Sequence, residues 1–90
     1  MANPEHLAIL KQGVGAWEDW IAEKPDTIVD LREADLCGLD LAGIDLRQAN
    51  LSRSDLCDTN LTGAQLFRAD LANARLAGAK LVDADLTQAT

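Results

Sequence analysis

A leucine stands at every fifth position of the chain from residue 31 to residue 86, twelve times without a gap. The set is Leu31, Leu36, Leu41, Leu46, Leu51, Leu56, Leu61, Leu66, Leu71, Leu76, Leu81 and Leu86. Two residues before each leucine stands a small or apolar residue, and the residue between them is polar, most often Asp or Asn. This repeating unit of small, polar and leucine positions organises residues 29–90 and predicts that they form one structure.

A period of five residues fits neither a helix nor a straight strand. Five helical steps turn about 500°, which would scatter the leucines around the whole cylinder. In a straight strand an odd step alternates between faces, so half of the leucines would face water. All twelve can point inward only if the chain turns a corner within each unit. In the extended part of a unit, Ala34 and Leu36 then share the inner face while Asp35 points outward.

The residues that follow each leucine have the composition of tight turns. The second of them is Gly, Asn or Asp in seven units: Gly38, Gly43, Asp58, Gly63, Asn73, Gly78 and Asp83. These residue types tolerate the positive φ angle that the third residue of a type II turn requires. The pattern therefore predicts a coil of short extended sides with leucine at its centre.

Units such as Ala34-Asp35-Leu36-Cys37-Gly38 and Ala69-Asp70-Leu71-Ala72-Asn73 resemble those of pentapeptide-repeat proteins. The resemblance covers about two thirds of the chain. It implies an all-β solenoid, a right-handed quadrilateral β-helix with four units per turn, over residues 28–90. Three coils would span residues 29–48, 49–68 and 69–88.

Residues 1–27 are expected to form one N-terminal α-helix and a linker. Asn3 is suited to the N-cap and Pro4 to the first helical position. An apolar stripe at three- and four-residue steps follows: Leu7, Leu10, Val14, Trp17 and Ile21. Gly13 and Gly15 predict tight packing or a bend within this helix.

The apolar stripe must be buried somewhere, and the open first coil offers the apolar surface. The inward residues Val29, Leu39 and Ile44 are bulkier there than those of later coils. We therefore interpret Leu7, Leu10, Val14, Trp17 and Ile21 as an end cap; a helix that docks a partner is the alternative. The segment also resembles the N-terminal segment of many cyanobacterial pentapeptide-repeat proteins.

Composition and charge limit the partners of this 90-residue chain. Its net charge of −7 disfavours nucleic acid and anionic membranes. No apolar run has the length of a membrane span and no secretory signal is present, so a cytoplasmic location is the default expectation. Two cysteines and one histidine make no metal-ligand pattern along the chain, and we expect no metal site and no cofactor.

The polar residues should stack in ladders twenty residues apart, for example Asp35 with Asp55. Such carboxylates could serve as acid–base groups or cation ligands, but a flat exposed face offers no pocket to shift their pKa values. We expect a solvated face and no catalytic residue. Phe67 should lie at a corner where Arg47 can cover its ring, and it is also a candidate contact for a partner.

The leading functional hypothesis is a non-enzymatic structural or protein-binding module built on a rigid rod. Some members of the resembled family bind type II topoisomerases such as gyrase by imitating duplex DNA, which is the alternative. Three coils span about 14 Å, a length of duplex that carries about eight charges. Residues 29–90 contain ten acidic and six basic residues, a net charge of only −4. A truncated or engineered piece of a longer solenoid is a further alternative.

Two structural expectations follow from the stacking. Cys37 and Cys57 should stack with parallel Cβ directions, about 4.8 Å apart, and remain free thiols. The last coil should expose Leu76, Leu81 and Leu86 and unpaired backbone groups, which favours a homodimer joined end to end at the C-terminal coil. The expected partner is therefore a second copy of the chain or another protein.

Overall fold

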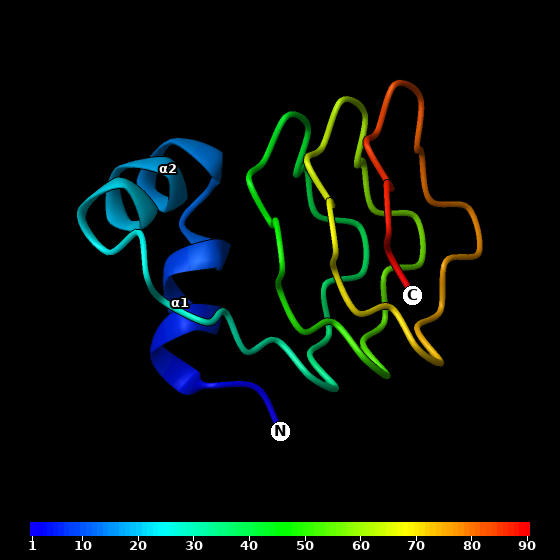
Figure 1. Ribbon diagram of the computed structural model, residues 1–90. Helices are drawn as coiled ribbons and strands as arrows, with labels where there is room; N and C mark the ends of the chain where they lie inside the picture. The colour runs from blue at the N-terminus through cyan, green and yellow to red at the C-terminus, as the bar shows by residue number, and fades with distance from the viewer.

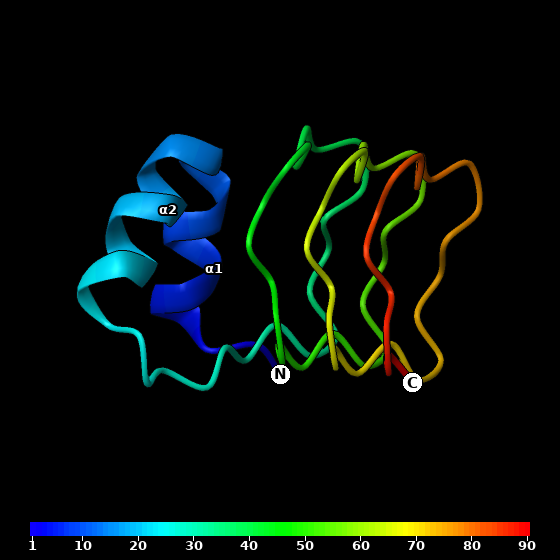
Figure 2. The same ribbon diagram turned by 45° about the horizontal axis from the view of Figure 1, so that its top comes forward.

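The computed structural model describes all residues 1–90. Two helices, α1 (Pro4–Lys11) and α2 (Val14–Glu23), lie at one end of the molecule. The rest of the chain winds into three stacked turns that lead away from the helices (Figures 1 and 2). We name them coil one (residues 29–48), coil two (49–68) and coil three (69–88).

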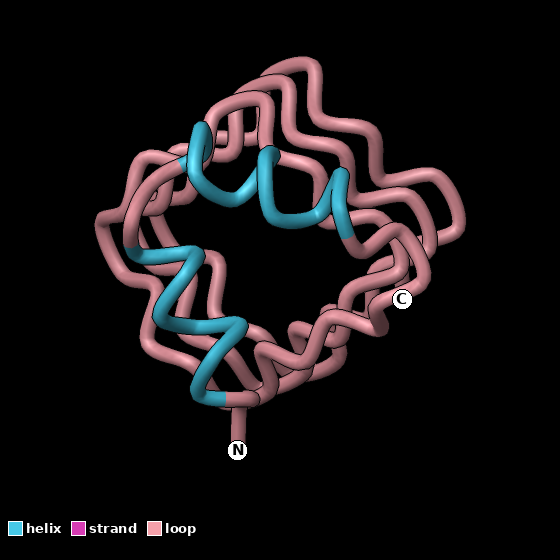
Figure 3. Tube along the Cα trace, turned by 90° about the vertical axis from the view of Figure 1, so that its left-hand side faces the viewer, coloured by secondary structure: helices cyan, strands magenta, loops and turns pink.

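Consecutive coils pair through eight isolated parallel β-bridges between residues twenty apart. The pairs are Asp30–Asn50, Asp35–Asp55, Asp40–Asn60, Asp45–Gln65, Asn50–Asp70, Asp55–Arg75, Asn60–Lys80 and Gln65–Asp85. Bridges that recur every five residues and pair residues twenty apart give each coil four sides, which are visible along the axis in Figure 3.

At each bridge, hydrogen bonds run in both directions between the two coils. The Leu31 amide donates to the Asn50 carbonyl, and the Asn50 amide donates back to the Val29 carbonyl, both at 2.9 Å. Because a side has only three extended residues before the next corner, no side reaches the length of a regular strand. The expected all-β solenoid therefore consists of short bridges and turns instead of strands assembled into a sheet.

In every corner, the second residue after the leucine has a positive φ. It is the third residue of the turn that begins at the leucine. In eight of the twelve corners this residue is not glycine: Glu33, Gln48, Arg53, Asp58, Arg68, Asn73, Asp83 and Gln88, with φ between 59° and 62°. The residues before them, such as Arg32 and Cys57, have no positive φ. Positive φ at the third turn residue alone is the signature of a type II turn. Each turn closes with a hydrogen bond such as that from the Ala34 amide to the Leu31 carbonyl, 3.2 Å.

The leucines fill the axis of the coils, and their burial falls toward the C-terminal end. The eight leucines at every fifth position from Leu31 to Leu66 are at most 1% exposed. Leu71, Leu76 and Leu81 are half-buried, and Leu86 is 40% exposed. The inward hydroxyls of Ser54 and Thr59 donate to the carbonyls of Leu51 (2.7 Å) and Leu36 (2.8 Å). These hydrogen bonds allow two polar residues to stand in the core.

The N-terminal segment forms two helices, so the expectation of a single helix was wrong. Asn3 is the N-cap of α1, and its side chain accepts a hydrogen bond from the Glu5 amide at 2.9 Å. The helix ends at Lys11 with Gln12 as its C-cap, because Gly13, with φ 110° and ψ 168°, leaves the helical conformation. Glycine adopts such a φ without steric cost, and Gly13 then becomes the N-cap of α2.

The two helices lie over the first coil. Leu10 and Trp17 are buried in the same apolar cluster as the leucines of the coils. Leu7, Val14 and Ile21 are partly buried and pack against that cluster. Neither helix is long and apolar enough to cross a membrane.

Candidate interaction surfaces

At the helical end, three hydrogen bonds join the N-terminal segment to the backbone of coil one. The Asn3 amide donates to the Asp30 carbonyl at 2.9 Å. The indole Nε1 of Trp17 donates to the Asp45 carbonyl at 2.8 Å. In the opposite direction, the Asp30 amide donates to Nδ1 of His6 at 3.0 Å.

These hydrogen bonds use backbone amides and carbonyls of coil one whose counterparts in coils two and three pair with the preceding coil. The Asn50 carbonyl, one coil further on, accepts from the Leu31 amide, and the Asn50 amide donates to Val29. On the sides of Asp30 and Asp45, the N-terminal segment therefore occupies hydrogen-bonding positions that a preceding coil would hold. It covers the end by burying apolar side chains and by satisfying backbone groups.

His6 and Trp20 belong to this arrangement; Trp20 was expected as a packing residue of the cap, whereas the role of His6 was missed. His6 is 7% exposed, and the ring centroids of His6 and Trp20 lie 5.1 Å apart. Trp17 and Trp20 are separated by 5.2 Å, and Nε1 of Trp20 is buried without a hydrogen-bond partner. Nothing in the pattern signals that a histidine accepts a backbone hydrogen bond.

The opposite end of the molecule is an open edge. The amides of Leu71, Leu76 and Leu81 donate to no backbone carbonyl, whereas the matching amides of coils one and two donate to the next coil. The carbonyls of Ala74, Ala79 and Ala84 accept no backbone hydrogen bond either. Unpaired donors and acceptors thus alternate along an edge whose leucines are half-buried or, at Leu86, exposed.

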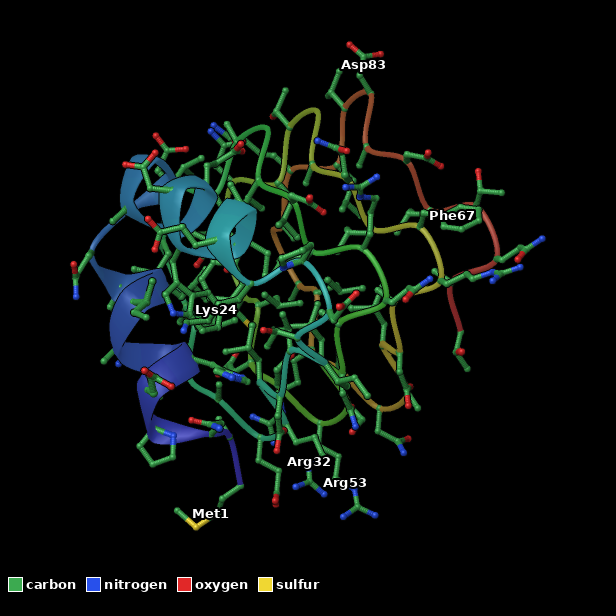
Figure 4. The ribbon with its side chains drawn as sticks, turned by 60° about the vertical axis from the view of Figure 1, so that its left-hand side comes forward. Met1, Lys24, Arg32, Arg53, Phe67 and Asp83 are labelled. Atoms are coloured by element: carbon green, nitrogen blue, oxygen red, sulfur yellow. The ribbon has the colours of Figure 1, made fainter.

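Two arginines on the sides of coil one hold carboxylates in bidentate pairs. Nε and a terminal nitrogen of Arg32 lie 2.9 and 3.0 Å from the Asp30 oxygens, and both Arg47–Asp45 distances are 2.9 Å. The hydrogen bonds from these arginine side chains lower the pKa values of Asp30 and Asp45. Arg32 projects at the same edge of the molecule as Arg53 and Met1 (Figure 4).

Phe67 lies half-buried on the outside of coil two (Figure 4). The expected cover by Arg47 was wrong, because Arg47 binds Asp45 and the guanidinium of Arg68 lies 5.1 Å from the ring centroid. Phe67 also lines an open groove of ≈ 270 Å³ with Ile21 and Pro25. The only carboxylate in that groove is Asp45, which Arg47 already holds, so the groove contains no acid–base pair.

On another side, Asp35, Cys37 and Asp55 place three ligand atoms within 4.8 Å of one another. Cys37 and Cys57 are both free thiols. A hydrogen bond to Asp55 and partial desolvation raise the pKa of the Cys57 thiol, and desolvation and nearby carboxylates raise that of Cys37. The spacing of twenty residues predicted that Asp35 stacks on Asp55 and Cys37 on Cys57, but not that carboxylate and thiol ligand atoms come together in one cluster.

The architecture is that of a repeat protein, in which each five-residue unit contacts the units of the next coil. The family model for pentapeptide repeats matches residues 29–63 and 64–90 with eight copies. The chain belongs to the pentapeptide-repeat family, whose fold is a right-handed β-helix.

A pentapeptide repeat protein from Nostoc Pcc 7120, known from its crystal structure, is 36% identical to this chain. The match covers 66% of this chain and 57% of the Nostoc protein, with a TM-score of 0.29. A comparison with curated proteins finds no match.

Proposed function

We propose that the protein is a non-enzymatic binding module whose open C-terminal edge pairs with a second copy of the chain. The observation that carries this proposal is the edge itself. It combines half-buried leucines with unpaired amides of Leu71, Leu76 and Leu81 and unpaired carbonyls of Ala74, Ala79 and Ala84. Such an edge is a template for pairing with another chain.

The arrangement of donors and acceptors supports a two-fold pairing. Because amides and carbonyls alternate along the edge, a copy rotated by 180° presents carbonyls opposite amides. The apolar flanks of Leu76, Leu81 and Leu86 would face those of the copy and leave water. Growth beyond two copies is disfavoured, since α1 and α2 already cover the other end.

The side faces support a non-enzymatic role. They carry ion pairs and exposed carboxylates, and the pocket beside Phe67 offers no acid–base pair. A carboxylate on such a face stays hydrated and charged, which gives it no means of acid–base catalysis near neutral pH.

Sedimentation velocity of the 90-residue chain over a wide concentration range tests the pairing. We expect a dimer that dissociates on dilution, and we expect Leu81→Arg and Leu86→Arg to give monomers by placing charge in the apolar contact. Val82→Arg is the matched control, because Val82 neighbours Leu81 but is 65% exposed on the outside of the coil. A monomer at every concentration, or dimers that survive Leu81→Arg, would overturn the proposal.

A further inference from the structure

One ladder on the coils differs from all the others in its charges. Among the eight bridges, Asp35–Asp55 is the only one that stacks two residues of like charge. Asp30 and Asp40 each face an Asn, and Asp45 faces a Gln. Like charges directly opposite each other in paired backbones are destabilising. The carboxylates of Asp35 and Asp55 therefore stand where a cation between them would stabilise the structure.

The third residue of this ladder is Arg75, which faces Asp55 from coil three, but no cation faces Asp35, and a thiol stands in the same unit as each carboxylate. Asp30 and Asp45 bind the arginines that stand two residues after them. Two residues after Asp35 and Asp55 stand Cys37 and Cys57, whose amides donate to one carboxylate oxygen of the preceding Asp at 3.1 and 3.0 Å. Neither carboxylate accepts a further hydrogen bond from an amide or an arginine, and Asp55 also accepts one from the Cys57 thiol. Two thiols, which prefer soft metal ions, and two carboxylates, which prefer hard ones, thus lie on one face of the coils.

We propose that Asp35, Cys37, Asp55 and Cys57 bind one thiophilic divalent cation of the zinc and cadmium class, a site that goes beyond the proposed binding function. Thiolate and carboxylate are both ligands of Zn²⁺, and thiolates select soft metals over Mg²⁺ and Ca²⁺. On binding, each S–H bond breaks, its proton passes to the buffer, and a metal–sulfur bond forms. No electron is transferred.

The distances among three of the four proposed ligands fit such a site after small side-chain rotations, and Cys57 lies beside them through its hydrogen bond to Asp55. Ligand atoms of Asp35, Cys37 and Asp55 lie within 4.8 Å of one another. Metal–ligand bonds of about 2.0–2.3 Å in a tetrahedron separate ligand atoms by about 3.3–3.8 Å. Each Asp–Cys pair sits on a corner that is hydrogen-bonded to the next coil, for example by the Gly38 amide to Cys57 at 2.9 Å. The backbone therefore holds the donors near their positions before a metal arrives.

Stacking of the two coils favours a bridging cation over a disulfide. In-register backbones about 4.8 Å apart carry their side chains in parallel, whereas a disulfide needs an S–S distance of about 2.05 Å. A tetrahedral metal needs its two sulfurs only about 3.8 Å apart. Both cysteines are free thiols and are therefore available as ligands.

Titration of the intact, reduced chain with Cd²⁺, followed by thiolate-to-metal charge-transfer absorption, tests the site. We expect one equivalent per chain, displacement by Zn²⁺ but not by Mg²⁺, and a higher melting temperature with metal. Cys37→Ser and Cys57→Ser should each weaken binding at least tenfold and remove much of the absorption. Asp55→Asn, which keeps the hydrogen bond to the Cys57 amide, should weaken binding while both thiols remain.

Asp70→Asn is the matched control, because Asp70 makes the same turn contact, with the Ala72 amide, on another side. It should bind Cd²⁺ like the wild type. Far-UV circular dichroism checks that each variant keeps the fold. The proposal is overturned by absence of a charge-transfer band at micromolar protein and metal, by unchanged affinity in folded Cys57→Ser, or by one metal shared between two chains.

Discussion

At the residue scale, the corners show what a sequence pattern can and cannot reveal. Glycine, Asn and Asp at seven corners predicted positive φ, and the structure has it there. The same conformation at Glu33, Arg53 and Arg68 had no local signal, because these residue types rarely adopt it. The period of five residues imposes the conformation, since a leucine can return to the axis only if every unit turns identically.

Substitution of corner glycines should separate conformational cost from steric cost. Gly38 has φ 75° with open space around its Cβ position, whereas a Cβ at Gly78 would collide with the Asp58 carboxylate. We expect Gly38→Ala to lower the free energy of unfolding by about 1 kcal/mol, and Gly78→Ala to lower it further. Urea denaturation measures both. Equal costs would show that the Asp58 side chain moves aside freely.

Acid should weaken the protein through the carboxylates that arginine holds. Hydrogen bonds from Arg47 lower the pKa of Asp45 in the fold below its ordinary 3.8, so the unfolded chain binds the proton more tightly. The contribution of Asp45 is therefore complete above about pH 5 and is lost as the pH falls below 3.8 toward the folded value.

Asp45→Asn keeps the side-chain oxygen that accepts a hydrogen bond from the Arg47 amide, but it removes the ion pair with the Arg47 guanidinium. We expect it to cost at most about 1 kcal/mol at pH 7, with a difference from the wild type that shrinks below pH 3. Asp70→Asn, at a carboxylate without an arginine partner, should show a smaller cost. Urea denaturation between pH 2 and pH 7 measures the free energy of unfolding of both variants and of the wild type. A loss of stability in Asp45→Asn that is constant with pH would contradict the expectation.

At the scale of elements, the amphipathic stripe predicted that the N-terminal segment is helical and which residues it buries. It could not predict the division into α1 and α2, because a glycine inside an apolar stripe is compatible with both a continuous and a broken helix. Nor could it predict the bonds of His6 and Trp17 to coil one. Those depend on where the helices dock, which is a property of the tertiary structure.

The two tryptophans of α2 provide a test of the bond to coil one. Trp17 is fully buried and donates to the Asp45 carbonyl, whereas Nε1 of Trp20 has no partner. We expect Trp17→Phe to lower the free energy of unfolding by about 2 kcal/mol, because a buried carbonyl loses its donor. Trp20→Phe should cost less than half as much in the same urea titration. Similar costs would mean that ring size alone determines the contribution of each tryptophan.

At the scale of the whole molecule, the repeat determined the fold far better than the role. Twelve leucines at one spacing allow a single kind of coil, so coil register follows directly from residue numbers. Surface function depends on which side chains meet across coils. The ion pairs of Asp30 and Asp45 neutralise part of the acidic surface of coil one, which makes it a poorer imitation of a phosphate backbone. A partner cannot be named from such a surface by its residues alone.

The open edge of coil three is the surface through which we propose that the protein pairs, and amide hydrogen exchange measures it directly. At concentrations where the chain is dimeric, we expect the amides of Leu71, Leu76 and Leu81 to exchange at least tenfold more slowly than in Leu81→Arg at the same concentration. Amides of coil two, such as that of Leu56, should exchange alike in both proteins, since the Leu56 amide already donates to Arg75 at 2.8 Å. Fast exchange of the three edge amides at every concentration would contradict the proposed pairing.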